Sequence, residues 1–260
     1  MSIIICNFSS VYGNQPFMEG LRRSGEATWI DLSQVPGTDC YCDDEAVETI
    51  RRRIADAGIK DASGIHFFDN GNYHYMSKIW TDMVQEPFSL VVFDHHPDMQ
   101  EPRFGNILSC GGWVKKVLEE NKFIDNIVII GVADHLVEEI PPHDKVTFIR
   151  ESEIVTLEGR SPDRVHSTFH IPHSTPLYLS IDKDALSPAY AATNWDQGSL
   201  DVAALKEIIA GLAASHKIIG VDICGERARD FAGDEYHTVQ EADALNDRIN
   251  RELAEFLQNL

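Results

Sequence analysis

The chain reads Val91-Val92-Phe93-Asp94-His95-His96-Pro97-Asp98 where a strand-forming run meets a set of metal-type ligands. The run of residues 90–93 is apolar on both faces, which is typical of a central strand in a parallel sheet covered by helices on both sides. In an extended backbone the alternating Asp94, His96 and Asp98 would leave on one face. Such donors can hold one divalent ion or two neighbouring ions, and a bound cation removes the cost of burying them unpaired. The stretch therefore predicts an α/β fold with a metal site where this strand ends.

Apolar or β-branched runs alternate with amphipathic stretches along the rest of the chain. Strands are expected at residues 3–7, 65–68, 89–94, 126–131, 146–149, 177–182 and 218–222, and helices at 44–57, 75–84, 113–121, 202–214 and 242–257. Residues 150–176 form the least regular stretch, which we expect to hold a helix and a loop. Because the sequence shows no internal repeat and no domain linker, we expect a single domain over residues 1–260.

Composition argues against several classes of partner. The 260 residues carry a formal net charge of -20, which opposes binding to nucleic acid or to an anionic membrane surface. No apolar run reaches the roughly 20 residues of a membrane span, and residues 1–8 read as a first strand rather than a signal peptide. The five cysteines are odd in number and scattered, which fits a reducing compartment. We therefore expect a cytoplasmic protein, with a homo-oligomer left open.

Acidic residues also end two later apolar runs. Asp182 ends the run of residues 178–181 and is followed by Asp184, while Asp222 ends the run of residues 218–221. In an open parallel sheet, ligands bind beyond the carboxyl ends of the strands. We therefore expect these carboxylates to gather at the same edge as Asp94.

His74 completes the candidate ligand set, because it follows a Gly/Asn turn at residues 69–73 and begins an expected helix. The set then holds four Asp and two His, listed as His74, Asp94, His96, Asp98, Asp182 and Asp184. Four carboxylates balance two divalent ions, and an oxygen-rich set favours Mn²⁺ over zinc or copper. Two such ions can share a water and lower its pKa, which makes hydroxide available at neutral pH.

These motifs resemble the arginase/agmatinase (ureohydrolase) family. Its D-x-H-x-D motif is similar to residues 94–98, its S-x-D-x-D motif to residues 180–184 with Pro188 following, and its upstream His ligand to His74. The resemblance implies a three-layer α/β/α sandwich with a mostly parallel sheet of about eight strands. It also implies two Mn²⁺ ions, one held by His74, Asp94, Asp98 and Asp182 and the other by Asp94, His96, Asp182 and Asp184.

The resemblance further implies a reaction, the hydrolysis of a linear C–N bond in a guanidino group by a metal-bridging hydroxide. Asp98 would hydrogen-bond that hydroxide. A carboxylate after a late strand would hold the guanidinium, and here that residue is Glu226, one position beyond the usual D-x-x-E spacing from Asp222. Glu226 is thus expected both in catalysis and in substrate binding.

Two departures from the family pattern bear on the substrate. The region of the family's proton-shuttle His reads Ser109-Cys110-Gly111-Gly112-Trp113, so His135 is the candidate replacement. In the G-x-x-D-x-D stretch Asp134 is kept as a candidate substrate-binding residue, but Leu136 replaces the second Asp. A small guanidino compound or an arginine within a peptide therefore fits better than free arginine.

A polar loop at residues 193–198 follows the second acidic motif, where the family lines its substrate cleft. Thr193 and Asp196 are its candidate substrate-binding residues.

Three other interpretations stay open. A DHH-type phosphoesterase shares the letters Asp94-His95-His96, but it needs an early D-x-D pair and a later GGGH segment that this sequence lacks. A deacetylase-like amidohydrolase uses one zinc, which would leave Asp98 and Asp184 surplus. The third is a metal-stabilised binding or regulatory protein without turnover, which the missing shuttle His favours.

Overall fold

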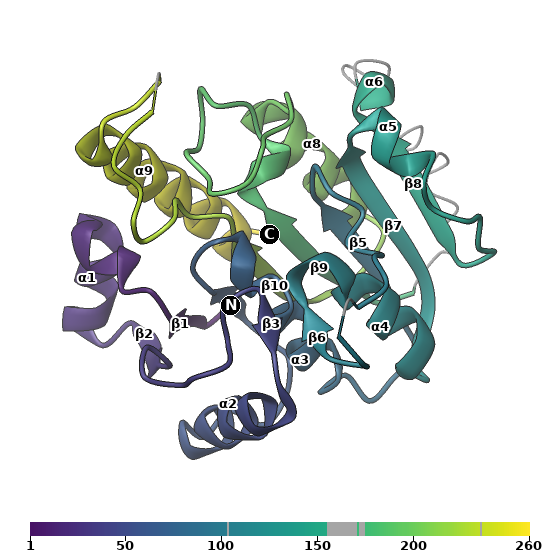
Figure 1. Ribbon diagram of the computed structural model, residues 1–260, viewed down its shortest axis with the longest axis horizontal. Helices are drawn as coiled ribbons and strands as arrows, with labels where there is room; N and C mark the ends of the chain where they lie inside the picture. The colour runs from purple at the N-terminus through teal and green to yellow at the C-terminus, as the bar shows by residue number, and fades with distance from the viewer. Residues whose placement is uncertain (103, 155–170, 172–174, 235) are drawn as a thin grey trace.

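An eight-stranded sheet forms the centre of the protein, in the order β2-β1-β4-β10-β9-β5-β7-β8 (Figure 1). The computed structural model describes residues 1–102, 104–154, 171, 175–234 and 236–260. The strands are β1 (Ile3–Asn7), β2 (Ala27–Asp31), β4 (Ile65–Phe67), β5 (Phe88–Phe93), β7 (Ile124–Val132), β8 (Val146–Arg150), β9 (Leu177–Asp182) and β10 (Ile218–Cys224). Each neighbouring pair in this sheet runs parallel.

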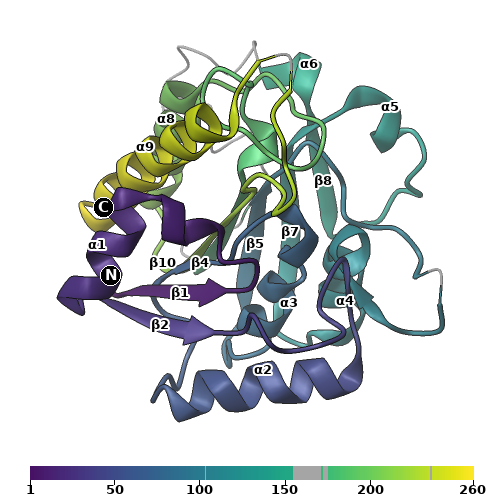
Figure 2. The same cartoon turned by 60° about the vertical axis from the view of Figure 1, so that its left-hand side comes forward.

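Helices cover both faces of the sheet, as Figure 2 shows. One face packs against α1 (Pro16–Ser24), α8 (Val202–Ala213) and α9 (Val239–Gln258), and the other against α2 (Asp44–Asp56), α3 (Met76–Thr81) and α4 (Trp113–Glu120). Alternate residues of a strand point to opposite faces, so Ile3 and Ile5 join the first core and Ile4 and Cys6 the second. The expected three-layer α/β/α architecture with a parallel sheet is confirmed.

The register of the central strands brings their carboxyl ends to one level. Phe93 at the end of β5 pairs with Ile181, and Cys224 at the end of β10 pairs with Asp182. The residues that follow β5 and β9 therefore emerge side by side at one edge of the sheet. This is the edge where ligands bind in parallel α/β folds.

A short antiparallel ribbon lies outside the main sheet. It pairs β3 (Tyr41–Cys42) with β6 (Leu108–Ser109). The described part of the chain also holds the short helices α5 (Asp134–Val137) and α6 (Glu151–Ile154). Among the helices that the structure describes, none combines the length and the apolar character that crossing a membrane requires.

Every predicted strand and helix is present, with ends that differ by up to three residues. The sequence analysis missed α1, whose buried apolar residues are only Met18 and Leu21, and β2, an edge strand with one partner. It also missed the short elements β3, β6 and α5. Of the irregular stretch at residues 150–176, positions 155–170 and 172–174 lie outside the described residues.

Candidate metal centre

The loop after β5 carries three of the candidate ligands. β5 ends at Phe93, so Asp94, His96 and Asp98 are not alternating residues of a strand as the sequence analysis expected. Instead the His96 N–H donates to Asp94 Oδ1 (2.6 Å), and Asp98 takes a left-handed backbone conformation with φ of 47°. The loop is tied down at its far end, because Val114 N donates to the Asp98 carbonyl (3.1 Å).

The end of β9 is also a turn. Asp182 is the last strand residue, and its Oδ1 accepts a hydrogen bond from Asp184 N (2.9 Å) at the start of a 3-10 turn, Lys183–Ala185. A third segment brings in His74, which ends the 3-10 turn Gly71–Tyr73 just before α3. Local side-chain to backbone hydrogen bonds, rather than strand alternation, aim these ligands into one place.

One group of ligands surrounds His74. Its Nδ1 lies 3.1 Å from Asp94 Oδ2, 3.1 Å from Asp98 Oδ2 and 3.5 Å from Asp182 Oδ2. On the other side of the ring, Nε2 lies 2.9 Å from Ser180 Oγ. When Nε2–H donates to Ser180, the lone pair of Nδ1 faces the carboxylates, which is the tautomer that a metal ligand needs.

A second group surrounds His96. Its Nδ1 lies 3.0 Å from Asp184 Oδ2 and 3.5 Å from Asp94 Oδ1, while Nε2 lies 3.1 Å from Asp196 Oδ1. Asp94 thus belongs to both groups, with one oxygen facing each histidine. Asp182 joins the His74 group, where its Oδ2 also accepts a hydrogen bond from the Cys224 thiol (3.1 Å).

The electrostatics of these groups call for a cation. Asp94, Asp182 and Asp184 are each no more than 2% exposed. Burial, and then the charge of Asp184, raises the pKa of Asp182 to about 7, and burial with the charge of Asp94 raises the pKa of Asp184 to about 6. Burial acts to lower the pKa of His74, but its hydrogen bonds to Asp94 and Asp98 raise that pKa well above its usual value. Divalent cations would relieve this repulsion, so the residues present fit a two-metal site.

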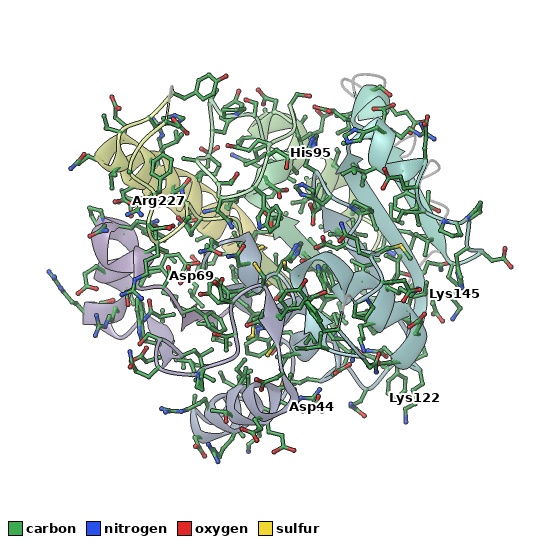
Figure 3. The ribbon with its side chains drawn as sticks, in the orientation of Figure 1. Asp44, Asp69, His95, Lys122, Lys145 and Arg227 are labelled. Atoms are coloured by element: carbon green, nitrogen blue, oxygen red, sulfur yellow. The ribbon has the colours of Figure 1, made fainter. Side chains whose placement is uncertain are left out.

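The ligands form the floor of a pocket of about 330 Å³. Five of the side chains that line it are carboxylates, namely the four aspartates of the candidate ligand set and Glu101. The aromatic side chains of Tyr41 and Trp195 line it as well. Figure 3 shows His95 beyond the end of β5 and, at the far edge of the sheet, Lys122 and Lys145, which precede β7 and β8. The five carboxylates of the pocket lie together at the carboxyl edge of the sheet, where a small cationic molecule would be attracted.

Glu226 and Asp222 are placed away from this pocket. Glu226 is fully buried, receives a hydrogen bond from Gln15 Nε2 (2.7 Å) and forms an ion pair with Lys183. The expectation that Asp222 ends its strand is wrong, because β10 continues to Cys224. Asp222 instead pairs with His66 inside the sheet (2.8 Å).

Three further predicted residues, Asp134, His135 and Thr193, also lie outside the pocket. Asp134 accepts a hydrogen bond from Ser152 Oγ (2.6 Å), and the neighbouring His135 is exposed. Thr193 Oγ1 donates to the Trp195 carbonyl (2.7 Å). None of these three is among the described residues that line the pocket, whereas Asp196 reaches the site through His96.

Sequence reasoning missed three residues that hydrogen-bond or face candidate ligands, and also the pocket residues Glu101, Tyr41 and Trp195. Trp113 Nε1 donates to Asp98 Oδ2 (2.6 Å), Ser180 faces His74, and Cys224 faces Asp182. Trp113 and Cys224 have apolar sequence neighbours, so their patterns indicate core residues. Ser180 alone carried a signal, since its motif S-x-D-x-D includes it.

Comparison with known proteins agrees with this geometry. The sequence model of the arginase family matches residues 64–226, which is more than half of the chain. The chain belongs to the arginase family. An uncharacterized protein from Thermotoga maritima is 30% identical to this arginase-family chain over 229 residues, covering 86% of the chain and 79% of the relative.

Solved structures share the fold. The proclavaminate amidino hydrolase from Streptomyces clavuligerus aligns with a TM-score of 0.67 and 16% identity, covering 98% of this chain and 91% of the other. The agmatine ureohydrolase of Thermoplasma volcanium aligns with a TM-score of 0.64 and 15% identity, covering 99% and 91%. Family membership supports a metal-dependent hydrolase in general terms, and these two likenesses show the arginase-like fold.

Proposed function

We propose that this chain is a hydrolase that holds two Mn²⁺ ions and cleaves a linear C–N bond in a guanidino group. The observation that carries the proposal is the position of Asp94, whose two oxygens face His74 and His96 separately. A carboxylate shared in this way would be able to contribute to both of two neighbouring cation sites. The oxygen-rich donor set favours Mn²⁺.

The two ions, when bound, supply positive charge that makes a hydroxide nucleophile available at neutral pH. The protein's own residues do the rest. Ser180 and Asp196 hold the far nitrogens of His74 and His96, so each ring keeps one tautomer and one orientation. Trp113 holds Asp98 through Oδ2, which leaves Oδ1 of that carboxylate to accept a hydrogen bond from the attacking water.

A guanidinium cation fits the rest of the pocket. Two dications balance the charge of the four ligand carboxylates, which leaves the Glu101 carboxylate at the pocket for the substrate cation. Glu101 has an exposed ion pair with Lys115, and a pair of that kind contributes little energy that a substrate must overcome. The ring faces of Trp195 and Tyr41 suit a flat cation. Glu226 takes no part in this proposal, because Lys183 already neutralises its carboxylate.

The pocket volume of about 330 Å³ suits a small guanidino compound or the side chain of one peptide arginine. Leu136 cannot hold an ammonium group, and Asp134 is engaged with Ser152. We therefore propose a substrate that carries a guanidino group but, unlike free arginine, no free α-amino group.

The test is to strip the protein of metal, reload it with Mn²⁺ and assay urea and amine release from a panel of guanidino compounds and arginine peptides. We expect release from at least one substrate and loss of turnover in Asp98→Asn. The matched control is Asp134→Asn, which changes a carboxylate outside the pocket and should keep activity. Two bound Mn²⁺ without any turnover would favour a binding protein. Release of phosphate from a phosphoester, or of acetate from an acetylated amine, in parallel assays would favour the other two enzyme classes.

A further inference from the structure

The mouth of the pocket carries two facing cysteines. Cys40 and Cys110 both line the pocket and are half-buried, so small molecules in the pocket can reach them. The thiols of Cys42, Cys6 and Cys224, by contrast, are buried. All five cysteines are free thiols in this structure.

The facing arrangement follows from the ribbon of β3 and β6. Its register pairs Tyr41 with Ser109 and Cys42 with Leu108, so Cys40 and Cys110 form the next rung. The hydrogen bond from Cys110 N to the Cys40 carbonyl (2.9 Å) confirms that rung. Cys40 precedes β3 and has a left-handed backbone (φ 58°), whereas opposed residues inside a regular antiparallel ladder have Cα atoms roughly 4.5–5.5 Å apart. That spacing falls within the roughly 4.4–6.8 Å that a disulfide spans.

The two thiols also interact with each other. Hydrogen bonding from Cys110 lowers the pKa of Cys40, and the same contact raises the pKa of Cys110. The thiolate is the nucleophile in thiol–disulfide exchange, and lower pKa favours it. Both thiols line the pocket, and the lowered pKa favours Cys40 as the attacking residue and Cys110 as the resolving one.

We propose that Cys40 and Cys110 are a redox modification site, closing to an intramolecular disulfide across the pocket mouth when a small-molecule disulfide is the oxidant. The Cys40 thiolate attacks one sulfur of the oxidant, the oxidant's S–S bond breaks, and one small thiol leaves with a proton. Cys110 then gives up its proton and attacks the Cys40 sulfur, and the second small thiol leaves. Two protein thiols are oxidised and one small disulfide is reduced to two thiols.

The disulfide would act on the metal site through the backbone. Cys110 begins the 3-10 turn Cys110–Gly112, and Gln100 N donates to the Gly111 carbonyl (2.8 Å). The next residue, Trp113, holds Asp98. A bond that draws Cys110 toward Cys40 therefore pulls on the segment that positions a candidate metal ligand.

The experiment treats the full chain, loaded with Mn²⁺, with oxidised glutathione, blocks the remaining thiols and maps the peptides by mass spectrometry. We expect the loss of two free thiols per chain, a peptide pair linked through Cys40 and Cys110, and full recovery with dithiothreitol. Cys40→Ser and Cys110→Ser should each abolish the link. The matched control Cys42→Ala removes a thiol from the same ribbon and should leave the link intact.

The wild-type mapping decides the question even where a variant fails to fold. Unmodified thiols, a stable glutathione adduct on Cys40, a link from Cys40 to Cys42 or a link between two chains would each overturn the proposal. None of these outcomes depends on the proposed hydrolase activity.

Discussion

Trp113→Phe tests whether the indole N–H holds the carboxylate of Asp98, a proposed metal ligand. Trp113 is fully buried, and its Nε1 donates to Asp98 Oδ2 at 2.6 Å. Phenylalanine keeps an aromatic ring at the position and removes only the donor and part of the ring volume. Trp80 offers a matched control, because it is also fully buried and its Nε1 has no hydrogen-bond partner among the described residues.

The size of the effect follows from the type of hydrogen bond. A hydrogen bond to a charged group contributes about 1.5–3 kcal/mol to stability. Trp113→Phe should therefore lower the free energy of unfolding of the metal-free protein by about that amount more than Trp80→Phe does, since both variants lose the same ring volume. Removing a residue that orients a ligand typically weakens metal binding about 10–100-fold. We expect that loss in Trp113→Phe and little change in Trp80→Phe.

Urea denaturation measures the stability of both variants, and electron paramagnetic resonance of free Mn²⁺ measures the binding. Equal Mn²⁺ affinity in Trp113→Phe and the wild type would refute the reasoning. So would an equal loss in the two variants, because the effect would then come from ring volume alone.

Four further predictions follow from the buried charges. Asp182→Ala should bind fewer than two Mn²⁺ per chain, and retention of two by elemental analysis would contradict the ligand assignment. The Mn²⁺-induced rise in Tm should grow from about pH 5 to 8, because the folded metal-free protein holds protons on Asp182 (pKa about 7) and Asp184 (pKa about 6) that Mn²⁺ must displace. These raised values also mean that the metal-free protein loses stability as pH rises from about 4 to 7, so thermal melts in EDTA that show no such fall would count against them. Glu226→Gln leaves Lys183 buried without its counter-charge and should lower the free energy of unfolding by about 3–5 kcal/mol, with the Mn²⁺ stoichiometry unchanged. A variant that keeps full stability but loses turnover would instead indicate that Glu226 belongs to the substrate site.

The central strands could be predicted from sequence because their own residues decide their structure. Runs such as residues 90–93 and 127–130 are apolar on both faces, and only a strand buried between two helical layers needs that pattern. β2 escaped prediction because it is an edge strand with alternating exposure and one partner. Its place in the sheet depends on β1, which no local pattern reveals.

The candidate ligands could also be predicted from the apolar runs that precede them, but the geometry that brings them together could not. Asp94 and Asp182 stand where apolar runs stop, so their position at the sheet edge followed from the strands. Asp98 reaches the site through a left-handed backbone and a distant indole, and neither has a sequence signature. Glu226 was predicted to hold the guanidinium group because nothing in the sequence shows that its carboxylate pairs with Lys183. That lysine lies between two candidate ligands at the end of a different strand.

The contrast between Glu226 and its neighbours separates structural from functional carboxylates in this fold. Glu226 is buried beside Lys183 and Asn250, so the chain itself supplies the cation and the hydrogen bonds that its charge requires. Asp182 and Asp184 are almost as deeply buried, yet the described cationic side chains in contact with them are histidines. Against the effect of burial, the pKa of His74 is raised by hydrogen bonds to Asp94 and Asp98, and that of His96 by Asp184 and Asp94, so these histidines depend on the same carboxylate cluster for their charge. Lys183 lies between Asp182 and Asp184 in the sequence, but its ammonium group pairs with Glu226. The charge of the two aspartates is therefore left to be balanced by ions from solution. The same segment thus stabilises the sheet edge with its own ion pair and keeps a cation site open next to it.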